Sequence, residues 1–202
     1  MKRNIFRTAL LPAAVAATIA FAGCSADDSM SDIGHGSSSP TASSSATTVG
    51  EFNDVDVIFA QMMIPHHEQA VDMSDMVLSK SNINPEVESL AKQIKAAQEP
   101  EIDMMNPWLE TWGRIQMPED SHHSSSDGTM TEEQMQELDE ANGPDGQRLF
   151  LEGMIRHHQG AIKMAQAEIA SGKNPDAITL AKNIAESQQA EMDTMTELLN
   201  KI

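Results

Sequence analysis

The fold of this chain is decided by a stretch of eleven residues that occurs twice. It reads MIPHHEQAVDM at residues 63–73 and MIRHHQGAIKM at residues 154–164, an offset of 91. A second set of matching residues follows each copy at an offset of 90, namely Gln98, Glu101, Asp103 and Met105, then Gln188, Glu191, Asp193 and Met195. An internal repeat of this kind indicates that one supersecondary unit is built twice.

Each copy of the repeat has the pattern of two helices joined by a short turn. Apolar residues recur at helical spacing, and no segment alternates as a strand would. The first copy covers about residues 53–112, with helices expected at 53–80 and 84–111, and the second covers about residues 145–202. Because neither hairpin can bury its apolar face alone, we predict an all-α four-helix bundle made from two duplicated αα-hairpins.

Residues at the expected helix ends support this organisation. The dipeptide Asn-Pro at 84–85 and again at 174–175 supplies an N-cap and a proline in the first turn. Asp145 is expected to cap the first helix of the second copy. Gly172 is expected to end that helix in the left-handed C′ conformation.

A linker at residues 113–144 separates the two copies. Its sequence TEEQ at 131–134 is a capping-box pattern, which predicts a short helix ending before Asn142. The first copy also contains three prolines that are expected to kink or break its helices, because proline removes a hydrogen bond and clashes with the preceding turn. They are Pro65, Pro100 and Pro107.

The first fifty residues have the pattern of a targeting signal followed by a spacer. A positively charged start and an apolar stretch are typical of a secretory signal over residues 1–23. The signal ends in FAGC at residues 21–24, which resembles the bacterial lipobox. We therefore expect Cys24 to be lipidated and to anchor the protein to the cell membrane on its extracytoplasmic side. Residues 24–50 have the Ser/Thr-rich composition of a flexible tether, and residues 51–202 form the predicted helical domain.

The charge of the chain excludes one class of partner. The 202 residues contain 31 Asp and Glu against 13 Lys and Arg, a formal net charge of −18, which becomes −21 once residues 1–23 are removed. Such a chain lacks the basic surface that nucleic acid requires, and its field attracts cations. It also contains 15 Met, 7 His and a single Cys, so no free thiol remains after lipidation of Cys24.

Histidine and methionine share faces of the predicted helices. Residues four or seven apart lie on one side of a helix, so each first helix offers two rows of these side chains. In the first copy the rows are Met62, His66, Met73 and Met76, and Met63 with His67; in the second they are His157 with Met164, and Met154 with His158. The secondary metal candidates are Met62 and Met76 of these rows, Met105 and Met195 of the partner helices, and His122 and His123 of the linker.

These donors favour a soft metal. Imidazole with thioether, in the absence of thiolate, suits copper and above all copper(I), although zinc or iron stays open. The competing interpretation is that the methionines only fill the core, because Met adapts to irregular gaps. His122 and His123 have no repeat counterpart and no helical frame, so a solvated loop is the favoured interpretation for them and a secondary metal-capture site is the alternative.

The repeated motif resembles a known family. Met-Ile-x-His-His-x-x-Ala-φ-x-Met, followed by Gln-x-x-Glu-φ-x-x-Met, is similar to the DUF 305 family of secreted or lipid-anchored bacterial proteins, over about residues 52–202. The resemblance implies a ferritin-like bundle and a copper-binding or copper-buffering role in copper tolerance. The ligands it implies by position are Met63, His66, His67, Met73, Met154, His157, His158 and Met164. Gly153 stands where the first copy has Met62, so the two halves need not bind equally well.

Two other functions compete with metal buffering. A ferritin-like bundle could be a di-iron oxidoreductase, but such proteins carry Glu-x-x-His motifs on facing helices. No Glu or Asp lies three residues before any of His66, His67, His157 or His158. No nucleophile motif is present either, so we expect no enzymatic activity. A metal-independent surface interaction module is the remaining alternative, because Met-rich surfaces bind diverse partners. The expected partners are metal ions and the membrane through the lipid, and a homo-oligomer stays open.

Overall fold

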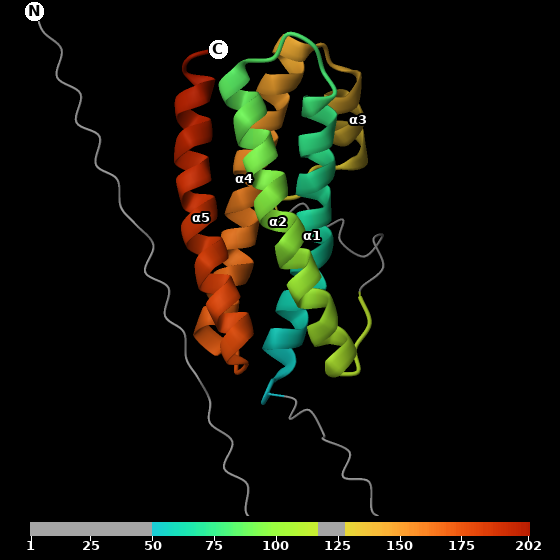
Figure 1. Ribbon diagram of the computed structural model, residues 1–202, viewed down its shortest axis with the longest axis vertical. Coiled ribbons are helices and arrows are strands. Elements are labelled where there is room, and N and C mark those ends of the chain that lie inside the picture. Colours follow the sequence, from blue (N-terminus) through green and yellow to red (C-terminus); the bar gives the residue numbers. More distant parts are fainter. Residues whose placement is uncertain (1–49, 117–127) are drawn as a thin grey trace, which may run out of the picture. The chain divides into compact units, whose positions relative to one another are not determined.

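Five helices make up the computed structural model, which describes residues 50–116 and 128–202. They are α1 (Asp54–Leu78), α2 (Pro85–Thr111), α3 (Glu132–Glu140), α4 (Gly143–Ser171) and α5 (Pro175–Leu199). These two ranges contain no strand, so the prediction of an all-α protein is confirmed. All five helices lie within residues 46–202, which form one compact unit by themselves (Figure 1). No described helix combines the length and the apolar composition that crossing a membrane requires.

The long helices α1 and α4 form the central pair of this unit. α2 packs along α1 and α5 packs along α4, while the short α3 contacts both α1 and α4 (Figure 1). The side-chain amide of Asn53, just before α1, donates to the backbone carbonyl of Ser171 at the end of α4, at 2.8 Å. The start of α1 therefore lies beside the end of α4, and the two helices run in opposite directions. At the other end, Gly143 at the start of α4 lies against the backbone of Ser81.

The two repeats fasten each other by equivalent hydrogen bonds. The backbone N–H of Asn174, the N-cap of α5, donates to Oδ1 of Asp56 on α1, at 2.7 Å. At the opposite end, the backbone N–H of Asn84, the N-cap of α2, donates to Oε1 of Gln147 on α4, also at 2.7 Å. Asp56 and Gln147 are repeat counterparts, and so are the two asparagines. The repeats are therefore related by an approximate two-fold rotation.

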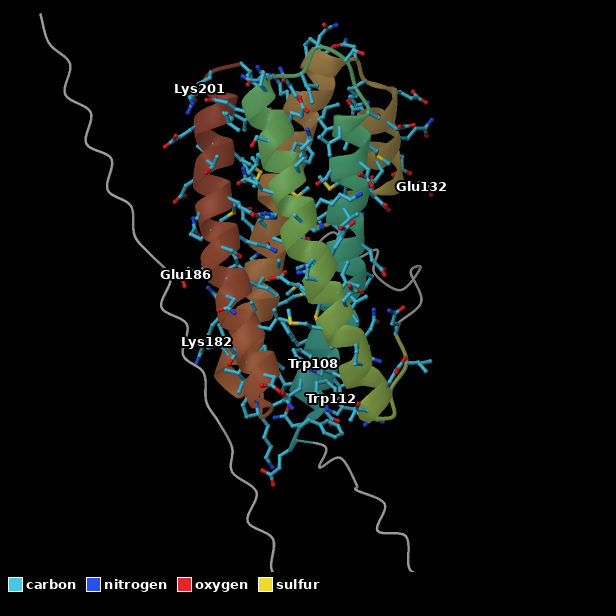
Figure 2. All side chains as sticks on the ribbon, viewed as in Figure 1. Trp108, Trp112, Glu132, Lys182, Glu186 and Lys201 are labelled. Atoms are coloured by element: carbon cyan, nitrogen blue, oxygen red, sulfur yellow. The ribbon has the colours of Figure 1, made fainter. Side chains whose placement is uncertain are left out.

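Two clusters of apolar side chains form the core, and each draws on all four long helices. The first lies where α1 begins and includes Val57, Phe59, Ile64, Leu109 and Ile184. The second lies where α1 ends and includes Val77, Ile94, Phe150, Leu151 and Leu198. Figure 2 shows Trp108 and Trp112 near the end of α2, where the Phe52 ring stacks on Trp112 at a centroid distance of 5.0 Å.

The start of α4 differs from its prediction. The side chain of Asn142 accepts a hydrogen bond from the backbone N–H of Asp145, so Asn142 is the N-cap and Asp145 lies in the first turn. The helix can begin this early because Pro144 needs no hydrogen-bond acceptor in a first turn. The predicted N-caps at Asn84 and Asn174 and the capping box of α3 are confirmed.

The end of α4 also corrects the sequence prediction. Gly172 has φ −64° and ψ 162°, so it is extended and not left-handed. Glycine fits here for a steric reason, because a Cβ atom would lie 2.7 Å from the backbone carbonyl oxygen of Glu168. The prolines do not break the helices, since α1 and α2 continue through them, and the expected kinks stay predictions. Packing along the whole length of both helices offsets the lost hydrogen bonds.

A buried carboxyl pair closes the end of the unit where α1 begins. Burial, then the hydrogen bond to Asp56 and its negative charge, raise the pKa of Glu168 to about 8. Burial also opposes ionisation of Asp56, but backbone hydrogen bonds from Asn174, Asn53 and Lys173, together with the Glu168 side chain, outweigh it and lower the pKa of Asp56. At neutral pH Glu168 is therefore protonated and Asp56 is ionised.

Glu168→Gln is expected to remove a loss of stability that the wild type shows as pH rises. An unfolded Glu releases its proton near its ordinary pKa of 4.5, whereas Glu168 keeps it to about 8, so the free energy of unfolding falls across that window. The measurement is chemical denaturation of residues 46–202 across that pH range. The exposed Glu152→Gln on the same helix is the control. Equal pH dependence in wild type and Glu168→Gln would contradict the assignment.

Candidate metal centre

Four buried histidines lie where α1 and α4 cross. His66 is 3% exposed, and His67, His157 and His158 are fully buried. The rings of His66 and His157 contact each other across the two helices, with centroids 3.7 Å apart and planes inclined by 42°. Because these two residues are repeat counterparts, their contact marks the centre of the two-fold relation.

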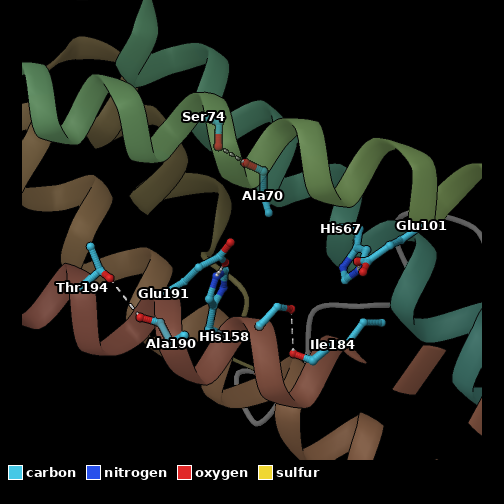
Figure 3. Close-up of polar contacts among 10 residues, drawn as sticks. His67, Ala70, Ser74, Glu101, His158, Ile184, Ala190, Glu191 and Thr194 are labelled. Atoms are coloured by element: carbon cyan, nitrogen blue, oxygen red, sulfur yellow. Dashed lines mark hydrogen bonds and ion pairs between the residues drawn. The ribbon is translucent and has the colours of Figure 1, made fainter. Parts of the chain in front are cut away.

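The second histidine of each pair is held by a glutamate from the adjacent helix. Nε2 of His67 lies 2.8 Å from Oε2 of Glu101 on α2, and Nε2 of His158 lies 2.6 Å from Oε2 of Glu191 on α5 (Figure 3). The glutamate side chains are 15% and 19% exposed, so each links a buried imidazole to the edge of the unit. This contact fixes the orientation of each ring and occupies Nε2, so Nδ1 is the ring nitrogen that the glutamate does not use.

The environment favours the neutral forms of His157 and His158. Burial, followed by repulsion from His66, holds the pKa of His157 well below its ordinary value. The pKa of His158 is also lowered, because burial outweighs the hydrogen bond and charge of Glu191 that favour protonation. A neutral imidazole is the form that binds a metal ion.

Several of the buried imidazole nitrogens lack a hydrogen-bond partner. No hydrogen-bond partner is present for either nitrogen of His157, or for Nδ1 of His67 and of His158. The backbone of His66 raises the pKa of His157, but this effect is smaller than that of burial. Leaving a buried polar atom unsatisfied costs about 1–3 kcal/mol. Native structures normally satisfy such atoms with water or an ion. The site therefore offers nitrogen donors that the fold itself does not use.

Methionines flank the histidines in two equivalent groups of three, which we call the first and second trio. The first trio is Met63 and Met105 of the first core cluster, with the half-buried Met164 packed against that cluster. The second trio, in the second core cluster, is Met154, Met195 and Met73. The two trios are repeat counterparts residue by residue. Since Met63 precedes His66 on α1 and Met73 follows it, the trios lie on either side of the histidines.

The remaining predicted ligands are placed less uniformly. Met62 is half-buried and belongs to neither cluster, and Met76 packs against the second cluster from its edge. Met104, which neighbours a trio member in sequence, is 46% exposed. His122, His123 and Cys24 lie outside the described residues, so the secondary loop site and the lipid anchor stay predictions.

Sequence reasoning missed four residues of this site. Glu101 and Glu191 orient the histidines, while Gln98 and Gln188 are each 2% exposed with side-chain amide atoms that lack partners. A signal was available, because all four belong to the matching set at an offset of 90. They lie three residues apart on their helices, so each Gln shares a face with its Glu.

The donor set fits a soft metal ion. Within the two described ranges, no three side chains of His, Cys, Asp or Glu are placed to hold an ion together. The helices that carry the buried imidazoles also place methionine thioethers in both core clusters, and imidazole with thioether suits copper(I).

The comparisons with known proteins agree with this architecture. A structure from Deinococcus radiodurans, a DUF305 fragment, is 31% identical, with a TM-score of 0.69 over 74% of this chain and 98% of that one. A DUF305 protein of Streptomyces coelicolor, whose description expects it to be secreted, is 30% identical, with a TM-score of 0.67 over 73% and 91%. CopM in its copper(II)-bound form is 33% identical, with a TM-score of 0.62 over 72% and 96%. CopM has also been solved with copper(I) bound.

A comparison with curated proteins gave no match. The model of one family, described as a domain of unknown function, matches residues 56–199. That match covers most of the chain and includes both copies of the repeat. This chain belongs to the DUF305 family.

Proposed function

We propose that this protein binds copper, preferentially copper(I), and buffers it outside the cytoplasm as part of copper tolerance. The observation that carries the proposal is the pair of contacting rings of His66 and His157, buried between two methionine trios. His157 contributes two nitrogens without hydrogen-bond partners. A fold that only needed a core would gain stability by replacing these groups with apolar side chains.

The implied ligands are the four histidines and the trios. Nδ1 of His67 and of His158 are the free donors of the glutamate-held rings, and His157 can use either nitrogen. Thioethers do not form disulfides, so they suit an oxidising compartment. Copper is cargo in this proposal, and we propose a binding protein and not an enzyme.

The relatives support the proposal from a second direction. CopM, which has a similar fold at 33–34% identity, binds copper(II) and copper(I) in its structures. The expected secretion of the Streptomyces coelicolor relative agrees with an extracytoplasmic location. We include the ferritin-like four-helix-bundle class in the proposal, supported by the packing of α1 on α2 and α4 and of α4 on α5.

The competing functions make different demands on the site. A di-iron oxidoreductase needs carboxylates that bridge two metal ions, whereas Glu101 and Glu191 each face one histidine from separate helices. A metal-independent interaction module does not need buried imidazoles. The binding assay includes zinc and iron as competing metals, because both fit part of the predicted donor set.

His157→Leu is expected to weaken copper(I) binding at least about tenfold and to keep or raise the thermal stability of residues 46–202. Leucine removes two nitrogen donors together with the cost of burying them. The measurement is anaerobic competition with a copper(I) chelator, beside thermal unfolding. His123→Leu is the comparison variant, and a loss of copper there would support the secondary loop site.

The same assay separates the alternatives. Unchanged copper affinity in His157→Leu would overturn the assignment of the site. Saturable iron binding with oxygen consumption, in place of copper binding, would support the di-iron oxidoreductase.

Glu101→Ala and Glu191→Ala are each expected to weaken copper binding about 10–100-fold, because carboxylates that orient metal-bound histidines contribute this much. Gln at either position keeps a hydrogen-bond acceptor and should restore part of the affinity. Asp103→Ala, an exposed acidic residue of α2, is the matched control for charge. An equal loss in the control would show that only the general negative field matters.

Cys24→Ser is expected to move the protein from the membrane fraction to the soluble secreted fraction, because a thioether-linked lipid can no longer form. The measurement is fractionation with mass spectrometry of the N-terminus. An unmodified Cys24 in the mature wild type would refute the lipoprotein assignment.

A further inference from the structure

A linker segment inserts one more methionine beside the second trio. The segment at residues 128–130 leads into α3 and lies against α1 and α4. The side chain of Gln69 on α1 holds it by two hydrogen bonds, because its Nε2 donates to the carbonyl of Met130 at 2.9 Å and its Oε1 accepts from the Met130 N–H at 2.8 Å. Met130 is 6% exposed and belongs to the second core cluster.

The sulfur of Met130 occupies the space that Gly153 leaves empty. A Cβ atom on Gly153 would lie 2.8 Å from Sδ of Met130 and 3.2 Å from the terminal methyl of Met73. The sulfur of Met130 and the terminal methyl of Met73 therefore lie against the same point of α4. Gly153 precedes His157 by one turn, so this point lies on the face of α4 that presents the buried imidazole.

The departures of the second copy from the first gather around this segment. Gly153 replaces Met62, and Gly160 replaces Gln69, the residue that holds the segment. Gly128 has φ +81° and packs so closely that a Cβ atom would lie 2.1 Å from the carbonyl oxygen of Arg156 and 3.3 Å from the nitrogen of Gly160. Small residues of α4 make room for the segment, and α1 supplies its hydrogen bonds.

We infer that Met130 is a fourth thioether ligand beside the second trio, so that the two halves of the protein bind copper(I) unequally. The inference rests on the proposed copper function. The first trio has no described counterpart of Met130 in its cluster, since Met62 lies in neither cluster. Softer, more numerous sulfur donors favour copper(I) over copper(II) and zinc, so the half that contains Met130 is the tighter copper(I) site.

The alternative explanation is that Met130 has only a packing role and fills the gap beside Gly153. Met130→Leu separates the two, because leucine keeps the apolar volume and removes the sulfur. Gln69→Leu is a second route to the same site, since it removes both hydrogen bonds of the segment and keeps every sulfur. Met104→Leu, at a position 46% exposed, is the matched control.

The experiment uses residues 46–202, labelled at the methionine methyl groups, with copper(I) alone as the probe. Anaerobic competition titration gives the affinity of each half, and methyl NMR follows the resonance that Met130→Leu identifies. We expect that resonance to shift early in the titration, with Met130→Leu lowering the tighter affinity at least about tenfold. Gln69→Leu should lower it less, and Met104→Leu should not change it. Thermal unfolding confirms that each variant folds.

Different experimental results would overturn this inference and the proposed function. Wild-type affinity in Met130→Leu, with an unmoved Met130 methyl resonance, overturns the inference while leaving copper binding intact. No copper(I) binding by the wild type overturns the proposed function and with it the inference.

Discussion

The antiparallel contact of α1 with α4 is the constraint on which the rest of the structure depends. It brings the repeat counterparts His66 and His157 ring to ring and buries four imidazoles in the interior. The same contact sorts six methionines into two trios, each taking members from both repeats. A shift of α1 along α4 by one turn would separate the rings and mix the trios. Register between these two helices therefore defines the site as much as the ligands do.

Polar groups at the ends of the unit show which interactions the fold needs. Asp56 and Gln147 have the same structural role, since each accepts a hydrogen bond from the backbone N–H of an N-cap residue in the other repeat. Only one end adds a second carboxyl, where Glu168 occupies the place of Val77 in the other copy. A neutral side chain thus suffices for the fastening. The buried carboxyl pair is an addition that the fold does not need for its architecture.

Much of this protein could be predicted from the duplication. Helical spacing and the Asn-Pro dipeptides predicted the all-α class and most helix ends, because caps and periodicity are local properties. The start of α4 was missed because Asn142 and Asp145 are both good caps, and only packing selects between them. The carboxylate partners of His67 and His158 were missed because helical spacing says nothing about which residues face each other across helices. Met130 had no signal at all, since it lies outside the repeat and is positioned by tertiary contacts.

The reciprocal fastening of the N-caps has a consequence for how the protein arose. One hairpin alone would leave the N–H of its own Asn84 or Asn174 without the acceptor that the other repeat provides. Two identical hairpins paired by the same rotation would satisfy each other in full, as the subunits of an isologous dimer do. The present chain has the geometry of such a dimer joined into one polypeptide. Joining freed the two halves to diverge, and Gly153, Gly160 and Glu168 record that divergence on α4.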